Sequence, residues 1–485
     1  MLGENAKLGN IKHEVLVQVA KAAFAGKLEE VRDQIPFDMI RGPQANFRCC
    51  IYKEREIIRQ RVRLAEGKAP NENLEDKNII QVINSACEGC PITRFTVTDN
   101  CQKCISKKCQ QACKFGAISM TKDRAYIDST KCKECGKCSE ACPYNAIADL
   151  MRPCKRSCPV DAITWDEYKI VHIDEEKCIQ CGACISNCPF GAIGDRSFMV
   201  DVIDLINAGR PVYACVAPAI EGQFGKEVSI GVLDKAIRQL GFCNVYEVAL
   251  GGDLVAQSEA KEWANAYKEG KKMTTSCCPA FVNMIHNLYP QLIDNISTTV
   301  SPMAAIARFI KQQDPDAVVV FIGPCIAKKG EVLDHVADTT ADYALTFEEL
   351  NAMFQAKDVD LSTYCGELQQ GSIYGKRFSQ SGGVTKAVIQ ALTELGEDTN
   401  IKVKQCDGAA ECKKALLLMK IGRLPEDFLE GMACVGGCMH GPGVVAKDNL
   451  TAKNRETLLQ AADDRKIGEN IAKFHAEHVD MHLHK

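Results

Sequence analysis

The stretch MACVGGCMHGPG, residues 432–443, places Cys434 and Cys438 four residues apart with two glycines between them. At this spacing, one helical turn or a tight loop directs both sulfur atoms toward a single inorganic centre. The glycines carry no side chain, so they let the backbone come close to whatever the sulfur atoms hold. Taken alone, a CxxxC pair is equally compatible with two buried structural cysteines. Its meaning therefore depends on the other cysteines of the chain.

Size and charge indicate an ordinary globular protein. The chain has 485 residues, a net charge of −4 and 25% charged residues, a length that suits about two to four domains. It shows no basic stripe typical of nucleic-acid binding. The opening MLGENAKLGNIKHE lacks the apolar core of a signal peptide, and apolar runs such as AVVVFIG (317–323) are too short to cross a membrane. We therefore expect a cytoplasmic protein with neither a nucleic-acid nor a membrane partner.

The unusual feature of the composition is its 28 cysteines. A disulfide framework suits small secreted chains, and no export signal is evident here. Cysteines grouped at CxxC spacing in a large intracellular protein instead indicate iron–sulfur clusters, because soft anionic thiolates suit iron. Such a protein is expected to work where oxygen is scarce.

Four short units between residues 101 and 193 end alike, in CKFGAI (113–118), CPYNAI (142–147), CPVDAI (158–163) and CPFGAI (188–193). This internal repeat resembles the half-motif of bacterial ferredoxins. There CxxCxxC binds three corners of one [4Fe–4S] cluster, and the cysteine before proline reaches the neighbouring cluster. The three complete units supply these candidate ligands: Cys101, Cys104, Cys109, Cys113, Cys132, Cys135, Cys138, Cys142, Cys178, Cys181, Cys184 and Cys188.

The third unit is incomplete, because it retains only Cys154 and Cys158. Cys87 and Cys90, in SACEGCP, could supply the missing pair and raise the number of accessory [4Fe–4S] clusters from three to four. A zinc site is the alternative for these two cysteines. Two pairings of the units remain open: one with two and three with four, or the nested scheme of one with four and two with three.

The first part of the chain is expected to be helical. Apolar periodicity predicts one helix over 11–34 and a second, arginine-rich helix over 52–66. The basic helix is either a solvated face or a docking surface for an acidic electron carrier. Cys49 and Cys50 lie between the two helices and are compatible with buried thiols or with spare cluster ligands.

From residue 212 onward, short β-rich runs alternate with helical patterns, which predicts an α/β domain with a buried parallel sheet. The expected strands are 212–218, 245–250, 273–276, 317–323 and 343–347, and the expected helices are 228–240, 258–269, 301–313, 384–395 and 454–474.

Three cysteine motifs follow one another in this region: TSCCPAF (275–281), GPCIAKKGE (323–331) and the 432–443 stretch. In order and approximate spacing they resemble the three H-cluster signatures of the [FeFe]-hydrogenases. The resemblance implies a two-lobed catalytic domain whose cleft holds the H-cluster, a [4Fe–4S] cluster joined to a diiron unit with CO, cyanide and azadithiolate ligands. The matching ligands are Cys278, Cys325, Cys434 and Cys438, of which Cys438 would also bridge to the diiron unit.

The resemblance also implies roles for residues around the diiron unit. Lys328 matches a lysine that donates to one cyanide, Ala217 and Pro218 match a backbone contact to the other, and Met432 matches a methionine packed against the irons. The residues that match the family's proton relay are Cys277, Glu259, Ser297 and Glu262. Without the resemblance, the two glutamates and the lysine would be expected on a solvated surface.

This sequence departs from well-studied members at several positions near the expected cofactor. Gly323 stands where they have methionine, Met303 where they have glutamine, and Thr385 and Lys386 where many have methionine and glutamate. These changes suggest the less-studied branch called group B. They leave the reaction in place but put its rate and directional preference in doubt.

The final stretch HAEHVDMHLHK places His475, His478 and His482 at near-helical spacing. We expect a solvated, frayed terminus, and adventitious metal binding is the alternative.

Together these patterns predict an α+β multidomain protein: a helical segment (1–84), a ferredoxin-like [4Fe–4S] relay domain (85–200) and a two-lobed α/β catalytic domain (201–485). The resemblance implies reversible H2 oxidation and proton reduction, ferredoxin or a similar soluble carrier, maturation proteins that deliver the diiron unit, and a monomer or homodimer. The alternatives are an H2-sensing regulatory protein with low turnover and a non-catalytic iron–sulfur assembly factor. Sensors of this superfamily usually lose relay residues, which this chain keeps.

Overall fold

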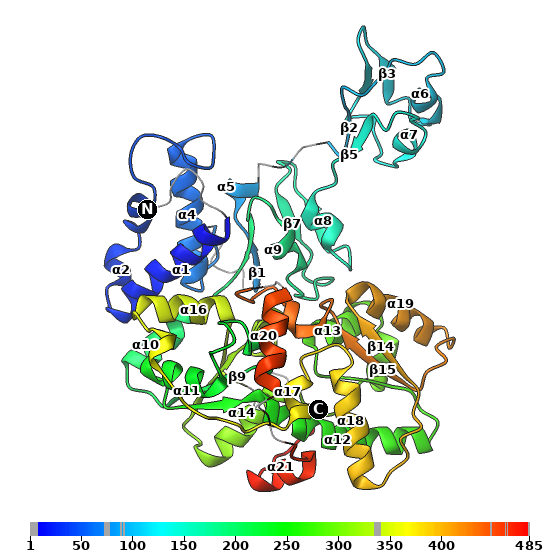
Figure 1. Cartoon of the computed structure of the whole chain (residues 1–485). Helices are drawn as coiled ribbons and strands as arrows, with labels where there is room; N and C mark the ends of the chain where they lie inside the picture. Colours follow the sequence, from blue (N-terminus) through cyan, green and yellow to red (C-terminus); the bar gives the residue numbers. More distant parts are fainter. Residues whose placement is uncertain are drawn as a thin grey trace.

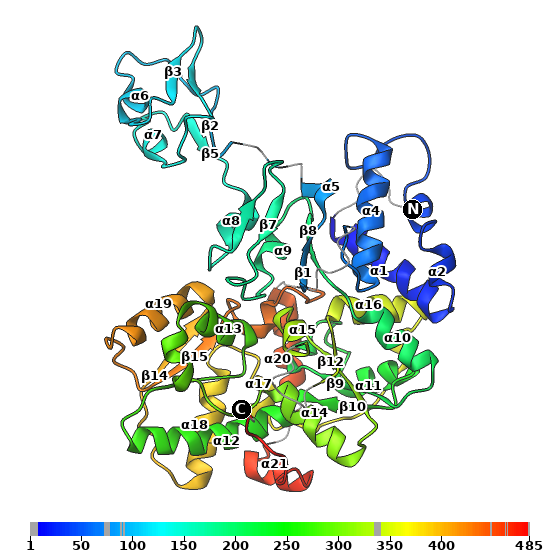
Figure 2. The same cartoon turned by 180° about the vertical axis from the view of Figure 1, so that it is seen from behind.

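The computed structural model describes residues 8–71, 78–87, 90, 93–333, 341–446, 449–460, 462 and 464–483. A broad body forms the base, an iron–sulfur region lies above it, and one small module projects away from the rest (Figure 1; seen from behind in Figure 2). Within the residues described, no helix is both long and apolar enough to cross a membrane.

The N-terminal residues form helices that pack onto the body. Helix α1 (Leu8–Phe24) lies against α16 (Phe347–Ala356) and α10 (Met199–Asn207). The prediction of one helix over 11–34 is wrong, because Gly26 takes a left-handed φ of 65° and ends α1. Shorter helices follow it: α2 (Leu28–Val31) and α3 (Ile35–Met39).

The arginine-rich helix is present as predicted. Helix α4 (Ile51–Ala65) buries Ile57, Ile58 and Val62 on one face. It therefore joins the N-terminal helices to the iron–sulfur region beside it (Figure 1).

The iron–sulfur region consists of two modules built alike, each with two antiparallel strand pairs. The outer module contains β2 (Phe95–Val97), α6 (Lys108–Ala112), β3 (Ile118–Met120), β4 (Ala125–Ile127), α7 (Lys137–Glu140) and β5 (Ile147–Asp149). The inner module contains β1 (Ile80–Val82), α5 (Asn84–Cys87), α8 (Pro153–Ser157), β6 (Ile163–Trp165), β7 (Val171–Ile173), α9 (Ala183–Asn187) and β8 (Ile193–Asp195). Because β1 pairs with β8, the outer module is an insertion within the inner one.

Two parallel sheets form the core of the body, as the two-lobed α/β prediction requires. One has the strand order β10-β9-β12-β13 and the other β11-β15-β14. Their strands are β9 (Val212–Val216), β10 (Asn244–Glu247), β11 (Met273–Thr274), β12 (Val318–Ile322), β13 (Tyr343–Leu345), β14 (Val403–Asp407) and β15 (Phe428–Met432). The sequence did not predict β14 and β15.

Helices surround both sheets. The long helix α12 packs against helices from both lobes and begins at residue 248, ten residues earlier than expected. The helix expected over 454–474 is two helices. The body helices are α11 (Ile230–Gln239), α12 (Val248–Lys268), α13 (Pro279–Leu288), α14 (Pro302–Gln313), α15 (Ala327–Glu331), α17 (Ile373–Arg377), α18 (Gly383–Leu395), α19 (Ala409–Lys420), α20 (Asn449–Leu459) and α21 (Ile467–Lys473), with 3₁₀ turns at η1 (Pro218–Ile220), η2 (Pro290–Asn295), η3 (Leu361–Thr363) and η4 (Gly437–His440).

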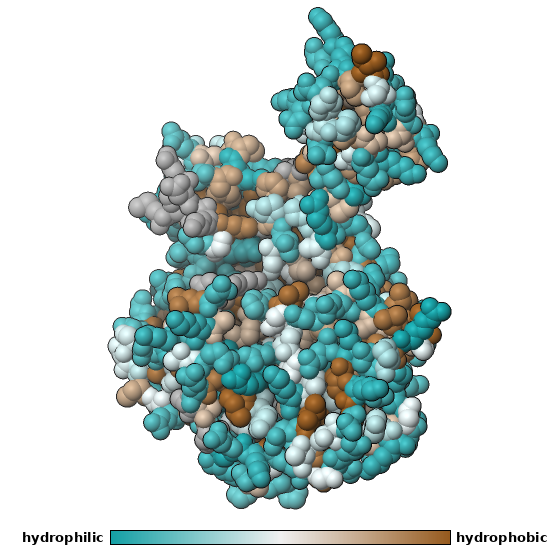
Figure 3. Space-filling model, turned by 45° about the vertical axis from the view of Figure 1, so that its right-hand side comes forward, coloured by the Kyte–Doolittle hydropathy of each residue, from teal (hydrophilic) through white to brown (hydrophobic). Residues whose placement is uncertain are grey.

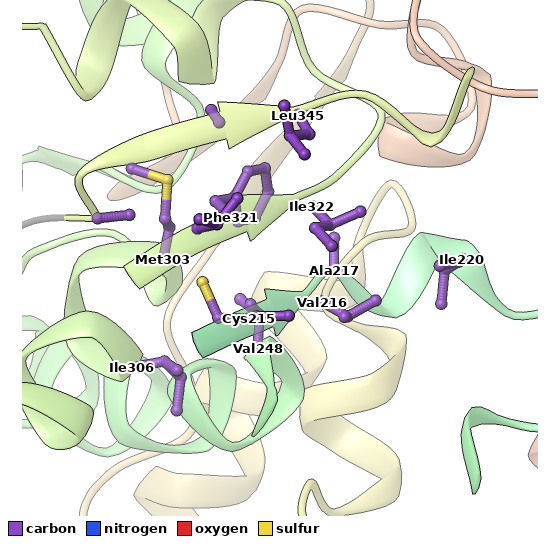
Figure 4. Packing of buried hydrophobic residues seen from close by; sticks show 14 of the residues in the cluster. Cys215, Val216, Ala217, Ile220, Val248, Met303, Ile306, Phe321, Ile322 and Leu345 are labelled. Carbon is purple, nitrogen blue, oxygen red and sulfur yellow. The ribbon is translucent and has the colours of Figure 1, made fainter. Parts of the chain in front are cut away.

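The four-stranded sheet is packed tightly around its central strands. Figure 4 shows Cys215, Met303 and Phe321 between the strands and the neighbouring helices, and all three are buried. Cys215 is thus one of the small buried hydrophobic residues expected among the cysteines outside the motifs. This packing fixes the strand ends from which the site residues project.

A buried ion network joins the inner module to the body. The Lys329 ammonium lies 2.7 Å from Asp195 Oδ2 of β8 and 2.8 Å from Glu349 Oε1 of α16, and it donates to the Arg196 carbonyl. Burial opposes the charge of Lys329, but the two carboxylates outweigh it and raise the pKa of this lysine. The network therefore holds the iron–sulfur region in a fixed position on the body.

We predict that Lys329→Met lowers the free energy of unfolding by roughly 3–5 kcal/mol, because it leaves the buried Glu349 and the partly buried Asp195 without their cation. Urea unfolding followed by circular dichroism measures the change. Lys268→Met, which removes an exposed pair with Glu397, is the control and should cost less than about 1 kcal/mol. Equal losses in the two variants would contradict the structural role of the network.

Candidate metal centre

Loops that follow parallel strands meet around a buried cavity of about 100 Å³. Cys278 follows β11 and precedes α13, Cys325 follows β12, and Cys434 and Cys438 follow β15. All four line the cavity. Since β11 and β15 belong to one sheet and β12 to the other, the cavity lies between the two lobes, outside the carboxyl ends of the strands.

Backbone hydrogen bonds bring the separate loops together. The Cys438 N–H donates to the Ser379 carbonyl at 2.8 Å, and the Gly443 N–H donates to the Pro324 carbonyl at 2.9 Å. Gly437 has a φ of 78°, and a Cβ there would lie 2.5 Å from the Ser379 carbonyl oxygen. Only glycine fits this approach, which explains the glycines between the two cysteines.

Three of the four thiols are costly to ionise where they lie. Burial raises the pKa of Cys325 to about 11 and that of Cys438 to about 12, and it raises the pKa of Cys434 well above its ordinary value. Neighbouring thiolates of the set raise these three pKa values further, because like charges repel. A cationic metal centre would replace the protons and remove this penalty.

The donor set fits a polynuclear cluster better than a single ion. Among the residues described, no three His, Cys, Asp or Glu side chains converge closely enough to hold one metal ion. The four cysteines instead surround a shared volume, as the corners of a [4Fe–4S] cluster require.

The rest of the cavity is mostly apolar. Its walls include residues expected around a diiron unit, and these are Ala217, Pro218 and Met432, together with Met303, Phe321 and Phe378. Such a lining excludes water and lowers the local dielectric constant, which strengthens any hydrogen bond made inside it.

Lys328 supplies the cation of the cavity. It is 7% exposed, and its Nζ donates to Ser301 Oγ at 2.8 Å and to Glu331 Oε2 at 2.6 Å. An ammonium group has three donors, so these two bonds orient the group and leave one donor available. The sequence did not point to Ser301 or Glu331, because their role depends on this contact.

One departure from the family pattern has a steric explanation. A Cβ added to Gly323 would lie 2.3 Å from the Phe321 ring and 3.2 Å from Ala217 Cβ. The Phe321 ring therefore takes up space beside the cavity that a longer side chain at 323 would need. Another departure, Thr385, donates through N–H and hydroxyl to the buried carboxylate of Glu430.

The expected relay residues lie close to one another between the cavity and the outer part of α12. Cys277 lines the cavity. Burial raises the pKa of the Cys277 thiol, and the nearby carboxylate of Glu259 raises it further. Glu259 Oε1 accepts from the N–H and the hydroxyl of Ser276, each at 3.4 Å. Ser297 Oγ donates to Glu262 Oε2 at 2.7 Å.

Glu259 is the more deeply buried of the two relay glutamates. It is fully buried, and its Oε2 has no hydrogen-bond partner among the residues described. Burial, followed by the charge of Glu262, raises the pKa of Glu259 to about 8. A carboxyl group with a pKa near neutrality can both accept and release a proton.

The accessory cysteines gather into four quartets. The members of a quartet either line one cavity or lie close enough for their charges to alter one another's pKa values. The quartets are Cys101, Cys104, Cys109 and Cys142; Cys113, Cys132, Cys135 and Cys138; Cys158, Cys178, Cys181 and Cys184; and Cys87, Cys90, Cys154 and Cys188. Units one and two therefore exchange ligands in the outer module, and units three and four do so in the inner module.

Each repeat also positions a backbone donor on its last cysteine. The alanine four residues later donates its N–H to the sulfur atom at 3.2–3.4 Å; the pairs are Ala117 to Cys113, Ala146 to Cys142, Ala162 to Cys158 and Ala192 to Cys188. Hydrogen bonds to sulfur stabilise the thiolate and raise the reduction potential of a bound cluster.

The inner module reaches the catalytic cavity through Cys181. This residue lines the cavity. Its thiolate would raise the pKa of Cys434, and the thiolate of Cys325 would raise the pKa of Cys181, so the three sulfur atoms lie close together. The third quartet and the cavity are therefore neighbours, which suits electron transfer between their clusters.

Three arginines surround the fourth quartet. Arg152 and Arg48 oppose the rise that burial causes in the pKa of Cys90. Arg61 is buried, and burial lowers its pKa to about 10. Among the nearby charges, the thiolate of Cys188 does most to favour the cationic form of Arg61. Arg61 donates to the Gly191 carbonyl, and its Nε has no partner among the residues described. Helix α4 thus provides Arg61, and the loop before it provides Arg48, as counter-charges.

Two candidate cysteines stay outside every quartet. Cys49 and Cys50 are exposed. Among the described cluster cysteines with a shifted pKa, none owes that shift mainly to Cys49 or Cys50. Cys406 and Cys412, also outside the motifs, are free thiols that lie close to each other beside β15.

Three family models match the chain in succession. They are a 4Fe-4S binding domain over residues 125–148, an LdpA Fe-S cluster-binding domain over 148–199, and the C-terminal domain of the iron only hydrogenase large subunit over 210–442. The matches cover both iron–sulfur modules in part and nearly all of the loops around the cavity.

Matches to known relatives cover between 43% and 73% of the chain. The periplasmic [Fe] hydrogenase large subunit of Nitratidesulfovibrio vulgaris is 30% identical over 68% of this chain and 89% of its own length. Iron hydrogenase 1 of Clostridium pasteurianum is 27% identical over 73% and 69%. The cytosolic Fe-S cluster assembly factor NAR1 of Kluyveromyces lactis is 23% identical over 43% and 58%. Among solved structures, HydA1 from Chlamydomonas reinhardtii (variant E141A) covers 60% of this chain and 96% of its own, at 19% identity and a TM-score of 0.48.

The pKa of Glu259 predicts a pH-dependent stability difference. Because this pKa rises from 4.5 to about 8 on folding, the folded state binds more protons between these values, and wild-type stability falls as pH rises through the window. Glu259→Gln should gain about 1.4 kcal/mol relative to wild type for each pH unit inside it. Urea unfolding across the window measures the difference, with Glu269→Gln, an exposed acid at the end of the same helix, as the control. Parallel stability curves for wild type and Glu259→Gln would contradict the burial argument.

The arginines predict a shift in cluster potential. Arg61→Met should make the midpoint potential of one accessory cluster more negative, because a nearby cation stabilises the more negative reduced cluster. Redox titration followed by electron paramagnetic resonance measures the shift. Arg59→Met, on the same helix but partly exposed and paired with Glu56, should leave every potential in place. Unchanged potentials in Arg61→Met with full iron content would rule out the proposed counter-charge.

Proposed function

The chain belongs to the iron-only hydrogenase family, and from this premise we propose that it interconverts H2 with protons and electrons, which it exchanges with a ferredoxin-type carrier. It is a hydrogenase, an oxidoreductase that works with iron–sulfur clusters. The observation that carries the proposal is the meeting of Cys278, Cys325, Cys434 and Cys438 around one apolar cavity between the lobes.

The four cysteines would hold the [4Fe–4S] part of the H-cluster, and Cys438 would bridge to its diiron unit. When bound, that cofactor supplies a Lewis-acidic iron and an adjacent amine base, which together cleave H2. Since one thiolate would be the only protein bond to the diiron unit, contacts from Lys328, Met432 and the backbone at Ala217 and Pro218 must fix its position.

Protons would travel along the buried chain beside the cavity. Cys277 faces the cavity, Glu259 is next to it, and Ser297 and Glu262 continue toward the surface. Each member can accept one proton while it releases another, which is what transfer through an apolar region requires. This intact chain supports an enzyme with turnover rather than a hydrogen sensor or an assembly factor.

Electrons would pass between the cavity and the outer module through the accessory clusters, on a route separate from that of the protons. The third quartet adjoins the cavity through Cys181, and the outer module would be the point of contact with the carrier. That module exposes Ile105 and Phe115, and Figure 3 shows hydrophobic atoms at its surface. Exposed lysines nearby, which are Lys103, Lys107, Lys108 and Lys114, suit an acidic carrier such as ferredoxin.

The same reading defines the remaining units and partners. We propose residues 1–84 as an N-terminal segment, 85–200 as the relay and 201–485 as the catalytic domain. The helices of the first segment cover the relay, and its last strand, β1, joins the relay by pairing with β8. Maturation proteins would deliver the diiron unit to a monomer or homodimer. So many free thiols suit the reducing cytoplasm.

Infrared spectroscopy of the matured protein tests the function directly. Wild type should show CO and cyanide bands that change between inert gas and H2. Cys438→Ala should lose these bands and keep the accessory-cluster signals, whereas Cys365→Ala, at an exposed cysteine outside the quartets, should keep both. A wild type without such bands would refute the function, and bands retained in Cys438→Ala would refute the bridging role.

A further inference from the structure

The residues after α21 run back along the body and pair with the strand-like segment that follows Ser297. The Val300 N–H donates to the Met481 carbonyl at 2.8 Å, and the Leu483 N–H donates to the Thr298 carbonyl at 2.9 Å. The prediction of a frayed terminus is therefore wrong for residues 480–483, which are held in a defined register, whereas His482 is solvated as predicted.

A buried arginine secures the same segment. Arg308 of α14 is 5% exposed, and its guanidinium donates to the carbonyls of Asp480 at 2.7 Å and His482 at 2.9 Å. Asp480 in turn accepts from the His482 N–H at 3.1 Å. These bonds fix the backbone of His482 and so restrict where its imidazole ring can lie.

The imidazole ring lies at the outer end of the relay. His482 Nδ1 is 3.2 Å from Thr298 Oγ1, and the Thr298 hydroxyl also donates to Glu262 Oε1. The direct distance from Nδ1 to Glu262 Oε1 is 3.7 Å, too long for a hydrogen bond. The threonine hydroxyl therefore bridges the two.

Exposure increases stepwise along these groups. The side chain of Glu262 is 16% exposed and that of His482 is 61% exposed, whereas Glu259 is fully buried. The imidazole is thus the member of the chain in open contact with water.

We propose that His482 is the group through which the relay exchanges protons with solvent, and that Thr298 positions it; this rests on the proposed hydrogenase function. During H2 oxidation, a proton leaves Glu262 for the Thr298 oxygen as the Thr298 proton moves to Nδ1. The imidazolium then releases a proton to water and becomes neutral again. The same steps run in reverse during H2 production, and no electrons are transferred in either direction.

Histidine suits this position because imidazole gains and loses protons near neutral pH. Among the residues described, the charged groups facing it are Glu262 of α12, Arg308 of α14 and Asp480 of its own segment. A surface group that trades protons with buffer shortens the time for which Glu262 waits between turnovers.

Turnover of variants tests the proposal. In weakly buffered solution, His482→Ala and Thr298→Val should oxidise H2 about tenfold more slowly than wild type, while Thr298→Ser, which keeps the hydroxyl, should stay near wild type. Added imidazole should restore His482→Ala. The control His478→Ala changes an exposed histidine of the same segment and should have no effect. A wild-type rate in His482→Ala, or a loss that imidazole does not restore, would overturn the proposal.

A second measurement does not depend on turnover. In ¹⁵N NMR spectra of the full-length protein, the ring signals of His482, identified by their absence in His482→Ala, should move in Thr298→Val and stay near their wild-type positions in Thr298→Ser. The reason is that only the valine removes the hydroxyl that lies 3.2 Å from Nδ1. Unchanged ring signals in Thr298→Val would refute the contact. A wild type that shows this contact but no H2 turnover would instead refute the proposed function, and with it the role of His482 in catalysis.

Discussion

The structure depends on the cost of placing four thiolates in one apolar cavity. Burial and repulsion from neighbouring thiolates raise the pKa values of Cys325, Cys434 and Cys438, so the arrangement is stable in its ionised form only with a cationic centre among the sulfur atoms. The fold brings the loops together by backbone bonds that do not involve sulfur, notably from Gly443 to Pro324 and from Cys438 to Ser379. These backbone bonds hold the loops together independently of the sulfur ligands.

On the proposed function, electrons and protons would leave this cavity by separate routes. The iron–sulfur modules cover one side of the body, and the insertion of the outer module into the inner one would lengthen the electron path away from it (Figure 1). The proposed proton path follows α12 to the segment where residues 480–483 cross the body. Buried cations are distributed accordingly: Arg61 lies near an accessory quartet, and Lys328 lies at the cavity.

Local patterns predicted much of this architecture. The cysteine motifs pointed to the ligands because CxxC and CxxxC spacings are readable within one turn, and the α/β alternation predicted both lobes. Strand β14 was missed because VKQCD is polar and only half-buried, and the start of α12 was mistaken for a strand because VAL (248–250) is apolar and β-branched at its first residue. The roles of Arg61, Ser301 and His482 depend on contacts between segments far apart in the chain, which no local pattern contains.

Anomalous diffraction at the iron absorption edge, from crystals of the matured protein, tests the central claim most directly. The account predicts iron between the sulfur atoms of Cys278, Cys325, Cys434 and Cys438, extending into the apolar cavity beside Cys438, and one further iron cluster in each accessory quartet. Iron confined to the accessory quartets, with side chains filling the cavity, would contradict it.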